Sequence, residues 1–81
     1  MRVPKVILRF LLEKRLLENR CANVVEVEEH LSKLGLRVGS VEKYVKLLRR
    51  RSLIDIVNDS NSYMLCAKDD LRTVLLALDN D

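Results

Sequence analysis

The sequence has 81 residues, enough for one domain but too few for two separate hydrophobic cores. Hydrophobic residues make up 48% of the chain and charged residues 33%, a balance that excludes a disordered tail. With 4% aromatic residues and only two glycines, the composition favours helices over a β-sandwich or barrel.

A first helix is predicted from Pro4 to about Asn19, because proline is well tolerated in a first helical turn. The apolar residues of this helix lie around most of its circumference instead of along one stripe. A monomer of this size has too little protein to cover such a helix, so we expect a homodimer formed by the first and last helices. The predicted interface residues are Ile7, Leu8, Leu11, Leu12 and Leu76.

The apolar run 6–12 is too short for a membrane span, which needs roughly 18 apolar residues. Arg9 interrupts it, charged residues follow it, and no small-residue cleavage site is present, so it is not a signal peptide. We therefore expect a cytoplasmic protein with no membrane partner.

Residues 22–24 are β-prone and predict one short strand. A second helix is predicted from about Glu26 to Leu34, with acidic residues in its first turn, where the helix dipole favours them. Its predicted inward face has helical spacing, and His30 on that face is expected to be packed and not a ligand. The residues of this face are Val27, His30, Leu31 and Leu34. Gly35 follows as the expected left-handed exit.

Ser40 is the predicted N-cap of a third helix that runs from Val41 to about Arg51. One arc of this helix is apolar and predicted to pack inward, consisting of Val41, Tyr44, Val45 and Leu48. The opposite arc is charged, consisting of Glu42, Lys43, Lys46, Arg49 and Arg50. The segment 35–51 has six basic residues and one acidic residue, a net charge of +5, which is suited to attract phosphates.

Two β-prone runs, 53–57 and 63–66, flank the polar stretch 58–62 and predict a β-hairpin over about 53–66. A last helix is predicted over about 68–79, with Leu71, Val74, Leu75 and Leu78 as its inward stripe. The fold class is therefore mainly α with a small antiparallel hairpin (α+β), in the order α-β-α-α-β-β-α, and residues 1–81 form a single domain.

The sequence contains no pattern typical of an enzyme. It has one histidine, no glycine-rich phosphate loop and no plausible Ser-His-Asp or Cys-His set. Cys21 and Cys66 lack the spacing of a zinc site. We expect no catalysis, no metal, no cofactor and no small-molecule substrate.

Three consecutive segments resemble the winged helix-turn-helix regulators, namely the segment Glu26–Gly35, the turn Leu36–Ser40 and the helix Val41–Arg51. The last of these leads through Leu53 and Ile54 into the predicted hairpin. This prokaryotic and archaeal group includes the MarR, ArsR and PadR families. The resemblance implies a helix-turn-helix over about 26–51 and a wing over about 53–66. It implies sequence-specific binding of double-stranded DNA by a dimeric transcriptional regulator associated with the nucleoid, with the third helix in the major groove.

The expected DNA-binding residues lie on the third helix and at its N-terminal end, where side chains can reach base edges and phosphates. They are Arg37, Ser40, Glu42, Lys43, Lys46, Arg49 and Arg50. Two features count against DNA binding, namely Glu42, which repels phosphates, and the stretch 58–62, which has an acidic residue and no basic one. The alternative is a winged helix that binds another protein. An RNA or single-strand binder is less favoured, because Tyr63 is the only plausible exposed aromatic residue.

In a winged helix the first short strand pairs with the last wing strand, which would put Cys21 beside Cys66. A disulfide between them is conceivable, although two buried free thiols are the default in a reducing cytosol.

Overall fold

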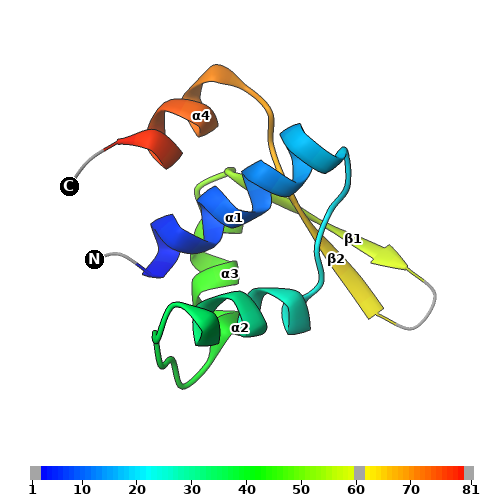
Figure 1. The fold of residues 1–81 in the computed structure, drawn as a ribbon. Helices are drawn as coiled ribbons and strands as arrows, with labels where there is room; N and C mark the ends of the chain where they lie inside the picture. Colours follow the sequence, from blue (N-terminus) through cyan, green and yellow to red (C-terminus); the bar gives the residue numbers. More distant parts are fainter. Residues whose placement is uncertain (1–2, 60–61, 80–81) are drawn as a thin grey trace.

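The computed structural model describes residues 3–59 and 62–79 and contains four helices and one two-stranded sheet (Figure 1). The elements are α1 (Val3–Glu18), α2 (Val24–Lys33), α3 (Val41–Arg50), β1 (Ile54–Asp59), β2 (Ser62–Ala67) and α4 (Leu71–Leu78). The mainly helical α+β class is as predicted. The strand expected at 22–24 is reduced to a single antiparallel bridge between Ala22 and Leu65.

The hairpin has Ile56 opposite Leu65 and Asn58 opposite Tyr63. Its strands extend further into 58–62 than predicted, so only residues 60–61 of that expected loop remain, and these lie outside the described residues. Because side chains alternate along a strand, one face of the sheet carries Ile54, Ile56, Leu65 and Ala67, which join the core.

Helix α1 lies at the centre of the fold and contacts α2, α3, α4 and β2 (Figure 1). Ile7, Leu8, Leu11 and Leu12 have only 0–4% of their surface exposed. These four side chains are core residues of the single chain and are not available to a second copy, which corrects the expectation that they form a dimer interface. The reason is that four other elements of the same chain cover α1. Of the expected interface residues, Leu76 alone stays on the surface, at 40% exposed.

The leucine stripe of α4 points toward solvent and not toward the core. Thr73 and Ala77 are fully buried and Val74 is partly buried, whereas Leu71, Leu75 and Leu78 are 58–73% exposed. The predicted inward stripe is therefore wrong for its three leucines. Small residues at 73 and 77 let α4 lie close to its neighbours, so the leucines are left outside.

The ends of α2 are fixed by local hydrogen bonds. Asn23 caps its N-terminus in a capping box, because the Asn23 side chain accepts from the Glu26 amide and the Glu26 carboxylate accepts from the Asn23 amide. Gly35 has a φ of +74°, the left-handed exit expected of it. Leu34, the C-cap residue, is 54% exposed, so its predicted place on the inward face is wrong.

Within the described chain, no helix is long and apolar enough to cross a bilayer.

Candidate nucleic-acid interface

Helix α3 separates its apolar and charged residues onto opposite faces, as predicted. Val41, Val45 and Leu48 are each 3% exposed, and Tyr44 is partly buried against the core. The other face is exposed and carries Glu42, Lys43, Lys46, Arg49 and Arg50. The core therefore holds α3 so that its charged face points into solvent.

The cations of this face have no acidic partner within residues 3–59 and 62–79. Some basic side chains elsewhere do have one, as in the contacts of Lys14 with Glu18 at 2.8 Å and of Arg20 with Glu26 at 2.9 Å. Lys43 is the one cation of this face that lies over a ring, 5.0 Å from the centre of the Tyr44 side chain. The four cations of α3 are thus not held in ion pairs within the described chain, unlike Lys14 and Arg15 on α1.

Arg37 and Ser40, expected at the N-terminal end of α3, are both exposed there. Ser40 occupies the N-cap position, but its side chain makes no capping hydrogen bond. The structure therefore brings all seven predicted residues to the exposed side of α3 and the turn before it.

A shallow hollow of about 170 Å³ lies between α3 and the hairpin; we call it the α3–hairpin hollow. Its lining residues are Glu42, Val45, Lys46, Arg49, Ile56 and Tyr63. The contribution of the hairpin to this surface is not among the sequence-based predictions. The alternation of side chains along a strand places Ile56 on the core face of β1, and this pattern could have indicated that the hairpin contributes to the surface.

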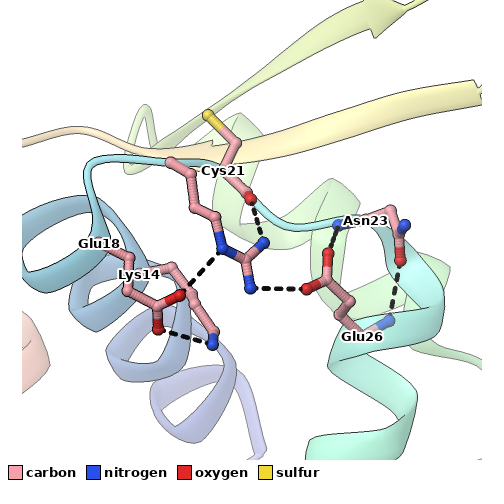
Figure 2. A network of polar contacts seen from close by, with 6 residues as sticks. Lys14, Glu18, Cys21, Asn23 and Glu26 are labelled. Atoms are coloured by element: carbon pink, nitrogen blue, oxygen red, sulfur yellow. Dashed lines mark hydrogen bonds and ion pairs between the residues drawn. The ribbon is translucent and has the colours of Figure 1, made fainter.

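The connection between α1 and α2 is held by a polar network centred on Arg20 (Figure 2). The Arg20 guanidinium donates to the Glu18 carboxylate at 3.0 Å and to the Cys21 carbonyl at 3.0 Å, and it pairs with Glu26 at 2.9 Å. The hydrogen bond from Arg20 and, secondly, the one from the backbone N–H of Asn23 hold the pKa of Glu26 below its ordinary value of 4.5. Lys14 and then Arg20 do the same for the pKa of Glu18. The network fixes where α2 begins relative to α1.

Cys21 and Cys66 form a disulfide. It attaches the connection between α1 and α2 to β2, next to the Ala22–Leu65 bridge. The two backbone hydrogen bonds of that bridge measure 3.1 and 2.7 Å.

A second surface feature is apolar and lies on α4. An open hollow of about 740 Å³ is lined by Arg51, Leu71, Arg72, Leu75 and Leu76. The Arg72 guanidinium donates to the Arg51 carbonyl at 3.0 Å, which joins α4 to the end of α3.

His30 is partly buried and stacks on Phe10, with ring centres 4.3 Å apart, as expected of a packed histidine. Among the residues that the structure describes, no three histidine, cysteine or acidic side chains gather in a way that could hold a metal ion. Comparison with protein-family models, with characterised proteins and with solved structures gave no significant match.

Proposed function

We propose that the chain is a winged helix-turn-helix domain that binds double-stranded DNA and acts as a small dimeric transcriptional regulator. In this proposal α2 and α3 are the helix-turn-helix, the β1–β2 hairpin is the wing, and α3 enters the major groove. The order of helix, bridge, two helices, hairpin and helix supports this assignment.

One observation carries the proposal, namely the exposed and unneutralised cations of α3. A helix that enters the major groove needs a polar outer face and a packed inner face, and α3 has both. Lys43, Lys46 and Arg50 are long enough to reach phosphates or guanine edges. Arg37 and Ser40 stand at the end of the helix that approaches the bases first. Glu42 suits this face where it accepts a hydrogen bond from a cytosine amino group.

The proposal is tested by titrating the purified chain with fluorescent random-sequence duplex at low salt. Affinity in roughly the micromolar range that falls steeply with added salt is expected, because phosphate contacts release counterions. An absence of binding at low salt would contradict DNA binding. Selection of bound sequences from a random pool then identifies the target.

A second copy of the chain is the proposed partner on α4. If two α4 helices pack antiparallel across Leu75, Arg72 of each copy approaches the C-terminal turn of the other, which carries Asp79. A cation is favoured there by both the carboxylate and the helix dipole. Surface leucines that are 40–73% exposed supply the apolar contact.

The dimer is tested by sedimentation of the wild type and of Leu75→Lys. The wild type should dimerise as its concentration rises. The variant should stay monomeric yet folded, because Leu75 is already 59% exposed in the monomer. A core variant, Leu11→Ala, is the matched control, since it should lower stability by about 2–5 kcal/mol whatever the protein concentration. A wild type that remains monomeric at high concentration would contradict the dimer.

The second candidate function is binding of another protein without DNA. The exposed leucines of α4 and the carboxylate of Glu42 within the charged face of α3 favour it. The duplex titration separates the two functions, because a protein-binding module would show no salt-sensitive affinity for DNA.

A further inference from the structure

Tyr63 joins the hairpin to the charged face of α3. It lies on β2 opposite Asn58, and its partly buried ring packs against the core. Its side chain lines the α3–hairpin hollow together with Lys46 and Arg49. Tyr63, which has a neutral hydroxyl donor, therefore lines the same hollow as two exposed cations of α3.

The hollow has the chemistry of a site for a sugar-phosphate unit. Val45 and Ile56 form an apolar lining, and Lys46 and Arg49 supply positive charge. A phosphate oxygen only accepts hydrogen bonds, and a tyrosine hydroxyl is among the side-chain groups that donate to it. Glu42 also lines the hollow, one helical turn before Lys46, and repels an anion there. The phosphate is thus favoured toward Arg49, one turn further along α3.

The hairpin itself has no lysine or arginine in its described strands, 54–59 and 62–67. It also keeps one carboxylate away from α3. Asp55 alternates with Ile54 and Ile56, which lie on the core face, so its side chain lies on the other face of β1. It is exposed there, with its carboxylate 3.9 Å from the Lys68 ammonium. The described strands of this hairpin can therefore contact a nucleic acid only through uncharged hydrogen-bond donors.

We infer that the hydroxyl of Tyr63 donates a hydrogen bond to a DNA backbone phosphate that Lys46 and Arg49 hold at the α3–hairpin hollow. The inference rests on the proposed function and adds the hairpin to the DNA-binding surface. It makes Tyr63 a positioning contact that fixes the register of α3 on the duplex and does not read bases.

The test is Tyr63→Phe, which keeps the packed ring and removes only the hydroxyl. Affinity for duplex should fall about tenfold, the loss expected for a hydrogen bond to a charged group. The dependence of affinity on salt should not change, because no charge is removed. Tyr44→Phe is the matched control, since the Tyr44 ring belongs to the inner arc of α3 and does not line the hollow. This control should bind like the wild type.

Of three other outcomes, two would overturn the inferred hydrogen bond and one would overturn the proposed function. Wild-type affinity in Tyr63→Phe overturns the inferred hydrogen bond, provided that the wild type binds duplex. Wild-type affinity in Tyr63→Phe with a loss in Tyr63→Leu also overturns it, and assigns the contact to the ring. A wild type that binds no duplex at low salt overturns the proposed function itself. Thermal unfolding of each variant checks that the fold is retained.

Discussion

Cys21 and Cys66 lie directly opposite each other, with their Cα atoms 4.7 Å apart, because the neighbouring residues Ala22 and Leu65 pair in an antiparallel bridge. The Cys21 carbonyl accepts from Arg20 on one side, and its sulfur points away from that network toward β2 (Figure 2). The short connection between α1 and α2 is thus attached to the hairpin by a covalent bond and to both helices by Arg20.

Reduction of this disulfide should destabilise the protein strongly. The bond spans 45 residues, and closing a loop of that length restricts the unfolded chain by an amount worth about 4 kcal/mol. For a domain of this size, the melting temperature should fall by roughly 15–30 °C on reduction. The double variant Cys21→Ser with Cys66→Ser should melt with the reduced wild type. Two free thiols in the unreduced, denatured protein, or equal melting temperatures in the two redox states, would contradict this prediction.

The N-cap residues of α2 and α3, Asn23 and Ser40, should differ in their contribution to stability. Asn23→Ala removes a side chain that accepts from the Glu26 amide at 2.9 Å, and it should cost about 1 kcal/mol of unfolding free energy. Ser40→Ala removes a side chain with no capping hydrogen bond, and it should cost much less. Urea unfolding of both variants measures the difference. A larger loss in Ser40→Ala than in Asn23→Ala would be inconsistent with the capping box.

Stability should also depend on pH in the acidic range. The pKa values of Glu18 and Glu26 are lowered in the folded state from 4.5, chiefly by Lys14 for Glu18 and by Arg20 for Glu26. A lowered pKa means that these carboxylates stabilise the fold above pH 4.5 and lose that effect as pH falls through the folded values. Urea unfolding across this range should show the loss. Glu26→Gln should reduce it, and an unchanged pH dependence in that variant would rule out the Glu26–Arg20 pair as a cause.

The elements could be predicted from the sequence wherever one helix or strand has a single buried face. Helix α3 is the clearest case, because Val41, Val45 and Leu48 recur at helical spacing and no charged residue shares their face of the helix. Hydrophobic spacing does not show how many neighbours cover a helix. The core position of Ile7 and Leu11 in α1 depends on four other elements and therefore could not be read from α1 alone.

Helix α4 shows a second limit. Its leucines predict an inward stripe by hydrophobicity, but Thr73 and Ala77 are the residues that pack. Small side chains are buried in preference to the leucines because they allow α4 to approach its neighbours closely. This closeness depends on the surfaces that face α4 and cannot be read from α4 itself. The same limit applies to the candidate site. The charged arc of α3 follows from its own sequence, whereas the addition of Tyr63 follows from the placement of a distant hairpin.

The charge on α3 should govern DNA affinity through phosphate contacts. Lys46→Ala with Arg50→Ala removes two exposed cations that have no acidic partner in the described chain. Duplex affinity should fall, and the slope of log affinity against log salt should flatten by roughly 0.9 for each lost phosphate contact.

The double variant Arg9→Ala with Lys68→Ala is the control, because it removes the same amount of positive charge. Arg9 is exposed on α1, and Lys68 lies beyond β2, so neither belongs to the charged face of α3. If both double variants lose affinity and slope to the same extent, net charge alone explains the binding. If neither does, α3 is not the DNA-binding surface. A loss confined to the α3 variant would assign the phosphate contacts to the charged face of that helix.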